Sequence, residues 1–296
     1  MSIKTINKLS PLVVALSIAS SNLYAGELTS FTNELKLNDY QDGVEKTELT
    51  LGKGVYKIND TLKFVFDVDK DFVAKNQLDE DSVAKEGWDS EFGVKQAIGS
   101  VAGMDLSLSY FVRYDQSWEA DSGDSSSYTA QYFFSPVFDT SFNIADNDYY
   151  FTVELWAQAG ETDGSSLQDV SGFESNFYFG GPLSENWSFD LAWYNFDYYD
   201  GSDYVYQAGT EDYLTYSLKL NDNLSFALEA YYEAYYTPDT ETVDYVGAHV
   251  KPMIKYKKKI GDDFTMFANL GYDAVKYVKG SGWSNNELEI SGGFKF

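Results

Sequence analysis

A short polar turn followed by alternating apolar and polar residues recurs six times along this chain. The copies are 59–64, 102–106, 146–151, 184–189, 221–226 and 261–266, and the copy at 102 is the loosest. Their starts lie 43, 44, 38, 37 and 40 residues apart. Asn, Asp and Gly tolerate the positive φ values of tight hairpin turns, so each copy predicts a chain reversal of two to four residues. One repeat therefore holds two strands and one longer loop.

Six short turns, with both chain ends on the turn side, predict fourteen strands and seven longer loops. A propeller also has repeats of about 40 residues, but each of its blades needs four strands. Strands of ten or more alternating residues, joined by short turns on one side and longer loops on the other, are typical of transmembrane β-barrels. The predicted strands are 27–38, 44–58, 62–72, 88–99, 104–117, 127–144, 147–160, 170–183, 187–199, 210–220, 224–236, 243–259, 264–278 and 284–296. The predicted fold class is an all-β, antiparallel, up-and-down transmembrane barrel.

The first 25 residues have the pattern of a signal peptide. Lys4 and Lys8 precede a short apolar run at 12–19, and Ala25 ends an acceptable cleavage site. The apolar run is too short to cross a bilayer as a helix. We therefore expect a signal peptide at 1–25 and a single barrel domain at 26–296.

Composition narrows the class of partner. Removing Lys4 and Lys8 with the signal peptide takes the formal net charge from −26 to −28, which argues against nucleic acid as a partner. The chain has no cysteine, which fits an exported barrel held by strand closure. Its 25 Tyr, 21 Phe and 6 Trp fit the aromatic girdles of a membrane barrel.

Alternation with period two assigns one set of side chains to the lipid and the other to the lumen. The predicted lining of the lumen is Asp67, Asp69, Glu91, Lys95, Asp105, Arg113, Asp115, Glu154, Trp156, Glu174, Tyr194, Glu229, Tyr231, Glu233, His249, Lys251, Lys255, Asp273 and Glu289. Charges of both signs would solvate an aqueous channel, and the acidic excess favours cations. Alternatively, many of these charges pair across strands and brace the wall.

The chain offers little for catalysis or cofactors. It has one histidine, His249, and no acid or serine lies next to it in sequence that could form a catalytic pair with it. With one histidine and no cysteine, a zinc site is not expected either. We expect no catalytic residue, no metal and no cofactor. Arg113 is the one arginine, so a dedicated polyanion channel is disfavoured. Inward tyrosines such as Tyr194 and Tyr231 leave open an aromatic track for saccharides.

The signal peptide, the fourteen strands, the short turns and the terminal Phe296 together resemble the monomeric outer-membrane porins of the OmpG type. The final strand, with its terminal aromatic, also resembles the assembly signal of bacterial outer-membrane proteins. The resemblance implies a monomeric channel in the outer membrane of a Gram-negative bacterium, passing ions and small hydrophilic solutes, including saccharides. Its partners would be the lipid bilayer, lipopolysaccharide and the outer-membrane assembly machinery.

Two departures limit that resemblance. The pH gate of the family uses a histidine pair, whereas this chain has only His249. The gating loop of the family is a long sixth loop, whereas here the sixth loop near 237–240 is short. The longest predicted loop, at 70–88, is instead the expected gate. The alternatives are a specific oligosaccharide channel, or an outer-membrane enzyme or adhesin with a plugged barrel. Oligogalacturonate porins resemble 12-stranded barrels with a basic lumen, and both features disagree with this chain.

Overall fold

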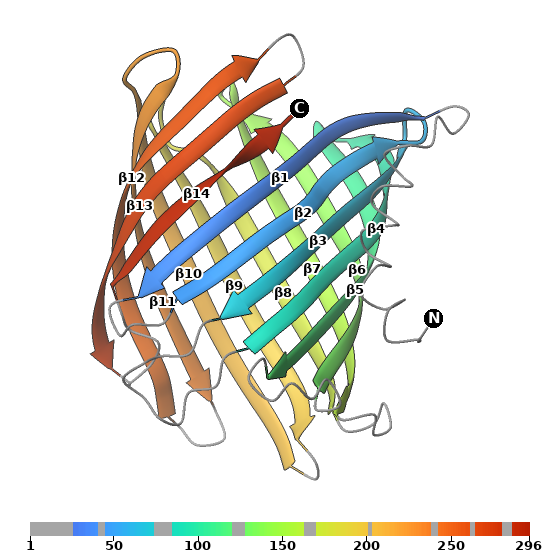
Figure 1. Cartoon of the computed structure of the whole chain (residues 1–296). Coiled ribbons are helices and arrows are strands. Elements are labelled where there is room, and N and C mark those ends of the chain that lie inside the picture. Colours follow the sequence, from blue (N-terminus) through green and yellow to red (C-terminus); the bar gives the residue numbers. More distant parts are fainter. Residues whose placement is uncertain are drawn as a thin grey trace, which may run out of the picture.

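The chain folds into one closed antiparallel β-barrel of fourteen strands, in which each strand pairs with its sequence neighbours and β1 pairs with β14 (Figure 1). The computed structural model describes residues 26–40, 45–73, 85–119, 128–162, 170–200, 203–237, 242–260, 264–279 and 286–296. The strands are β1 (Glu27–Tyr40), β2 (Glu45–Lys57), β3 (Leu62–Val73), β4 (Lys85–Val101), β5 (Met104–Glu119), β6 (Tyr128–Ile144), β7 (Asn147–Thr162), β8 (Val170–Pro182), β9 (Trp187–Asp200), β10 (Asp203–Lys219), β11 (Leu224–Thr237), β12 (Thr242–Ile260), β13 (Phe264–Lys279) and β14 (Glu287–Lys295).

The predicted fold class and strand number are confirmed. The signal-peptide prediction at 1–25 lies outside the described residues. No described helix is long and apolar enough to cross a membrane.

Several strand ends differ from the prediction by two residues or more. Strand β10 begins at Asp203 rather than 210, since residues 203–209 continue the ladder with β9. Strand β14 begins at Glu287 rather than 284.

The predicted gating loop at 70–88 is also shorter than expected. Residues 70–73 of β3 pair with residues 85–88 of β4, which leaves 74–84 between the two strands. Phe72, Val73 and Trp88, which the prediction placed in the loop, belong to the ladder. Residues 74–84 lie outside the described part, so the gating role stays a prediction.

The recurring polar turns form two kinds of reversal. In the turn from β2 to β3, the side-chain oxygen of Asn59 accepts hydrogen bonds from the backbone amides of Thr61 and Leu62, both at 2.9 Å. Asn221 does the same for the amides of residues 223 and 224 in the turn from β10 to β11. The copy at 261–263 lies outside the described residues.

Each asparagine turn also carries a lysine–aspartate pair three residues apart. Lys57 lies 2.7 Å from Asp60, and Lys219 lies 2.9 Å from Asp222. Their hydrogen bonds and charge hold the pKa values of Asp60 and Asp222 below the usual range. Both carboxylates are more than nine-tenths exposed, so these pairs add little to stability.

The turns from β4 to β5 and from β6 to β7 contain two residues each, both with positive φ. Gly103 suits this conformation, but Ala102 and Ala145 adopt φ values of 53° and 52° without being glycines. The left-handed region costs an L-residue roughly 1–2 kcal/mol because its Cβ crowds the following carbonyl oxygen. These two alanines therefore carry local strain.

We expect the Ala145→Gly variant to be more stable than the wild type by about 1 kcal/mol, because glycine relieves that strain. Urea unfolding of the barrel in lipid vesicles, followed by tryptophan fluorescence, measures the change. The matched control is Ala230→Gly in the middle of β11, which should lose about 0.5–1 kcal/mol because glycine weakens a strand interior. Destabilisation by Ala145→Gly would contradict the strain.

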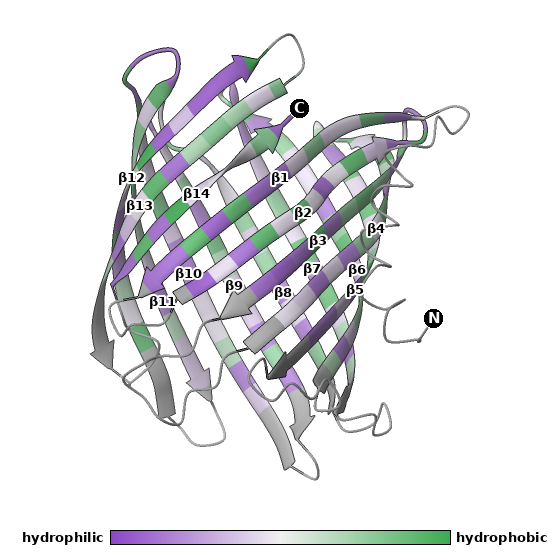
Figure 2. Cartoon of the chain, in the orientation of Figure 1, coloured by the Kyte–Doolittle hydropathy of each residue, from purple (hydrophilic) through white to green (hydrophobic). Residues whose placement is uncertain are grey.

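Hydrophilic and hydrophobic residues alternate along most wall strands, as β1, β2 and β14 show in Figure 2, so the wall has an apolar face and a charged face. Large apolar side chains remain about half exposed on one face, including Val112 at 54%, Trp193 at 52% and Phe294 at 51%. Exposed apolar surface of this extent on every side of a barrel fits contact with lipid. The charged side chains of the opposite face form the candidate site.

The barrel closes between β1 and β14, and β1 faces a bulge in β2 on its other side. The pairing of β1 with β2 shifts between Thr32 and Glu34, where the bulge at Leu51 of β2 lies opposite Asn33. Its side-chain amide donates to the carbonyl oxygens of Thr50 (2.8 Å) and Leu51 (3.3 Å), which fixes the bulge. At the end of the seam, the backbones of Phe31 and Phe296 exchange two hydrogen bonds of 3.1 and 3.0 Å.

Candidate functional site

The charged face is the concave face of the barrel. Several of its hydrogen bonds skip a strand, as from Lys95 of β4 to Asp139 of β6 (2.7 Å), and from Tyr231 of β11 to Asp273 of β13 (3.0 Å). Side chains converge on the inside of a curved wall, so such contacts arise there. The register places all nineteen residues of the predicted lining on this face. Their role in conduction stays a prediction.

Carboxylates dominate this face on β3, β4 and β5. In register, Asp67 lies opposite Glu91, and Asp69 lies opposite Asp89, which in turn lies opposite Asp115. We call these five residues the β3–β5 carboxylate cluster.

Two cations contact the β3–β5 carboxylate cluster, and one of them, Arg113, bridges two of its members. Arg113 contacts Asp89 at 2.8 Å and Asp115 at 2.9 Å, and its guanidinium carbon lies 5.4 Å from the centre of the Phe133 ring. Lys53 of β2 lies 2.6 Å from Asp67. With two cations and five carboxylates, the formal charge of this part of the wall is negative.

Carboxylates on β7 and β8 are held by neutral donors instead. Glu154 accepts hydrogen bonds from the indole nitrogen of Trp156 at 3.3 Å and from the hydroxyl of Tyr178 at 3.1 Å. The side-chain amide of Asn176 donates to Glu174. Neutral donors satisfy the oxygens of these carboxylates but leave their negative charge in the lumen.

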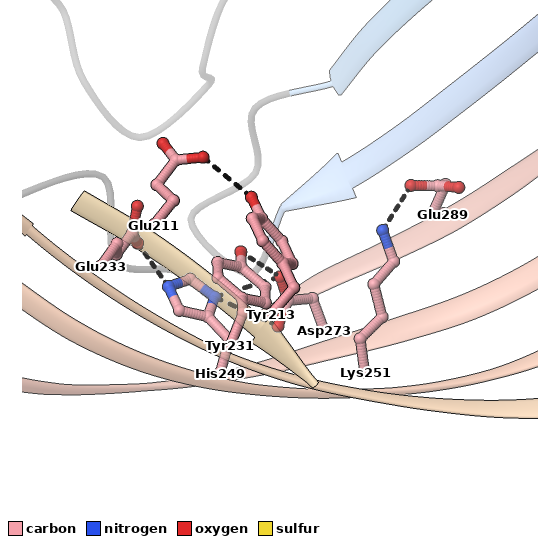
Figure 3. Close-up of polar contacts among 8 residues, drawn as sticks. All are labelled: Glu211, Tyr213, Tyr231, Glu233, His249, Lys251, Asp273 and Glu289. Atoms are coloured by element: carbon pink, nitrogen blue, oxygen red, sulfur yellow. Dashed lines mark hydrogen bonds and ion pairs between the residues drawn. The ribbon is translucent and has the colours of Figure 1, made fainter. Parts of the chain in front are cut away.

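His249 of β12 lies between two carboxylates (Figure 3). Its Nδ1 lies 3.1 Å from Asp273 of β13, and its Nε2 contacts Glu233 of β11. The side chains of His249 and Asp273 are each 6% exposed, and that of Glu233 is 15% exposed. Carboxylate oxygens only accept, so both contacts are hydrogen bonds when both ring nitrogens carry a proton. The arrangement therefore favours an imidazolium that bridges three strands.

A ring stack extends this group around the wall. Tyr213, Tyr231 and His249 lie directly opposite one another on β10, β11 and β12. The ring centres of Tyr213 and Tyr231 are 4.8 Å apart, and those of Tyr231 and His249 are 3.8 Å apart. The hydroxyl of Tyr231 donates to Asp273 at 3.0 Å. We call Tyr231, Glu233, His249 and Asp273 the His249 network.

Glu211 of β10 lies beside the His249 network and accepts three tyrosine hydroxyls. Tyr213 donates at 2.9 Å, Tyr235 at 2.6 Å and Tyr194 at 3.3 Å. These bonds tie strands β9, β10 and β11 together without a cation. The carboxylate is thus fixed in place while its negative charge remains.

The bases of the predicted lining have different partners. Lys251 lies 2.7 Å from Glu289 of β14, two strands away, although Glu229 lies opposite it in register. Lys95 contacts Asp139 at 2.7 Å, and this pair lines a cavity of about 480 Å³ that Asp105 also borders. Lys251 is therefore bound to Glu289, and Glu233 contacts His249.

Several site residues were absent from the predicted lining. Asp89 and Glu211 share the parity of residues assigned to the lumen, so extending the alternation would have found them. Lys53 lies beyond a bulge in β2, between Thr50 and Gly52, which reverses the parity. Asp139 lies on β6, where Phe133 and Val137 share its face and Phe134 and Phe138 lie on the other, so alternation gives no signal.

In the described part of the chain, no three His, Cys, Asp or Glu side chains are grouped as a metal site. The acidic excess is distributed along the wall in register rows and is not gathered around one centre. What the arrangement can do chemically is bind and exchange hydrated cations and polar solutes along a charged surface.

No protein-family model matches this sequence, and no curated protein matches it either. Among solved structures, the chain is similar to a ΔS2 mutant of the TodX monoaromatic hydrocarbon channel, with a TM-score of 0.50 and 8% identity over 92% of this chain and 90% of that one. It is also similar to CdiB from Acinetobacter baumannii (TM-score 0.49, 9% identity, 93% of this chain) and spans 60% of the CdiB chain. A loop L8 deletion mutant of OmpT, an outer-membrane protein of Vibrio cholerae, matches with a TM-score of 0.47 and 13% identity over 92% of this chain and all of that one. The fold is that of an outer-membrane β-barrel.

Proposed function

We propose that this protein is an outer-membrane porin of a Gram-negative bacterium. It forms a water-filled channel for passive diffusion of ions and small hydrophilic solutes, with a preference for cations. The observation that carries the proposal is the concave face of the closed barrel, on which carboxylates outnumber their cationic partners. The OmpG-type resemblance fits the same reading, with fourteen strands and a monomeric channel.

The cation preference rests on carboxylates without an ion pair. Among the described residues, no lysine, arginine or histidine lies within ion-pairing distance of Glu91, Glu174 or Glu229, whereas Lys251 and Arg113 have carboxylate partners. Unpaired carboxylates on a concave wall create a negative potential that raises the local concentration of cations. The alternative considered from the sequence, in which charges pair across strands and brace the wall, applies to Lys53, Arg113 and their partners. Paired charges and carboxylates without an ion pair therefore share the concave face.

An open lumen is consistent with the strand number. Barrels of about eight strands fill their interior with side chains, and those of 16–18 strands leave an aqueous channel. All the described residues lie in the wall strands or at their ends and turns, so none of these residues forms a plug. The apolar outer face suits a bilayer. The same proposal includes contact with lipopolysaccharide and a monomeric state.

Saccharides are among the proposed solutes, but the described tyrosines beside Glu211 and His249 do not form a stacking track for them. An aromatic track for sugars needs free ring faces, but Tyr213, Tyr231 and His249 stack on one another. The hydroxyls of Tyr194, Tyr213 and Tyr235 already donate to Glu211. Sugars would therefore meet carboxylates and ring edges rather than stacking platforms. We expect passage of saccharides by diffusion without tight binding.

Recording of single channels in planar lipid bilayers tests the function. We expect stable ohmic current steps and, in a potassium chloride gradient, a reversal potential that shows potassium crossing more readily than chloride. The variant Glu91→Gln/Glu174→Gln/Glu229→Gln should shift selectivity several-fold toward chloride, because it removes three carboxylates of the concave face that have no ion-pair partner among the described residues.

The matched control is Asp222→Asn, which removes an exposed turn carboxylate paired with Lys219. It should leave the reversal potential unchanged. A correctly assembled wild-type barrel that gives no current steps would refute the porin proposal. Current steps with a preference for chloride would refute the cation preference alone.

A further inference from the structure

A second cavity, of about 390 Å³, lies on the concave face near the turn-side end of β12, β13 and β14. Its charged lining is Lys255 and Lys257 of β12, Lys295 of β14 and Glu34 of β1. Three ammonium groups and one carboxylate give the cavity a formal charge of +2. This positive region contrasts with the net charge of −26 of the whole chain.

The lysines of this cavity differ from the other bases of the wall. Lys251 lies 2.7 Å from Glu289 and Lys95 lies 2.7 Å from Asp139, but in the described part of the chain no carboxylate lies within 4.0 Å of Lys255, Lys257 or Lys295. The register explains the difference. Lys255 lies opposite Ser225 and Asn269, and Lys257 lies opposite Phe267, so no acid is next to either on its neighbouring strands.

The neutral residues of the cavity add hydrogen-bonding groups and fix one cation. The side-chain amide of Asn269 donates to Ser291, which holds it at the cavity wall. The ammonium of Lys295 lies 5.8 Å from the centre of the Phe267 ring, within cation–π range. The exposed ammonium groups of Lys255 and Lys257 thus face a cavity with one fixed positive charge already in place.

We propose that this cavity is a binding site for the phosphate group of small soluble phosphomonoesters. A phosphomonoester carries a charge of about −1.5 to −2 at neutral pH, which matches the formal +2 of the cavity. Lysine binds phosphate as a point charge and does not need the fork geometry of arginine. The site lies on the concave face, which bilayer lipid does not reach, so the phosphate comes from a soluble molecule and not from a lipid headgroup.

Isothermal titration calorimetry on the barrel, refolded in a detergent without phosphate, tests the site with glucose 6-phosphate as the probe. We expect saturable binding that glucose does not show. The variant Lys255→Gln/Lys257→Gln should raise the dissociation constant at least about tenfold, because two of the three cations are removed. The affinity should also fall as the salt concentration rises.

The matched control is Lys219→Gln, which removes a lysine at the same end of the barrel that is already paired with Asp222. It should bind the probe as the wild type does. Equal affinity in the wild type and the double variant, or no saturable binding by the wild type, would overturn the proposal. Calorimetry does not need conduction, so failure of the site and failure of the porin proposal can be told apart.

Discussion

Replacing Gly293 with alanine is expected to prevent closure of the barrel. A Cβ at this position would overlap the carbonyl oxygen of Asn33 and lie 2.9 Å from both the Asn33 carbonyl carbon and the Glu34 Cα. Backbone atoms cannot move aside as a flexible side chain can. Asn33 is held by its hydrogen bonds to the backbone of β2. We therefore expect a loss of at least about 3 kcal/mol, the upper end for overpacking, and little assembled protein.

The fraction of folded barrel after refolding into lipid vesicles measures this effect, since folded barrels and unfolded chains migrate differently in detergent gels without heating. The matched control is the neighbouring Gly292→Ala. Its Cβ would lie 3.3 Å from the nearest atom, the carbonyl oxygen of Phe267, so a shift of a few tenths of an ångström accommodates it. Equal yields of Gly293→Ala and Gly292→Ala would show that the seam is not tight.

Replacing His249 with leucine should have the second large effect. The imidazole separates Glu233 from Asp273, and all three side chains are at least 85% buried. Without it, the carboxylates of Glu233 and Asp273 lose the cation that lies between them, and Lys251 is bound to Glu289. Removing one partner of a buried ion pair typically costs about 3–5 kcal/mol. We expect a loss of that size at pH 7.

The penalty should shrink as the pH falls, because protonation of Glu233 and Asp273 removes their repulsion. Urea unfolding in vesicles at pH 7 and at pH 4 measures both values. The triple variant His249→Leu/Glu233→Gln/Asp273→Asn should recover much of the loss at pH 7, since no buried charge is left unpaired. A deficit of the His249→Leu variant that is the same at both pH values, with no recovery in the triple variant, would show that packing rather than charge is responsible.

An exposed pair provides the comparison for this experiment. Lys219 and Asp222 are 71% and 95% exposed, so water screens their interaction. The variant Lys219→Met should therefore change stability by less than about 1 kcal/mol at either pH. The contrast isolates burial as the cause of the large effect at His249.

The sequence by itself determined the number of strands, their approximate bounds and which side chains share a face. Polar turns such as 59–62 and 221–224 separate segments with period two, and both signals are local, so they can be read from neighbouring residues. The same local alternation placed the predicted lining on one face. It worked best where one face is polar, as on β3 and β11, and gave nothing on β6, where apolar residues occupy both faces.

Only the tertiary structure decided which of these side chains meet. The partners of His249 lie 16 and 24 residues away in sequence, and the partner of Lys251 lies 38 residues away. Such pairs depend on the register between strands, and a bulge such as the one between Thr50 and Gly52 changes the register by one residue. Register follows from the sum of backbone hydrogen bonds and packing around the closed barrel. No short stretch of sequence contains that sum. The charged face of the lumen could therefore be predicted from the sequence, whereas the pairs that its side chains form could not.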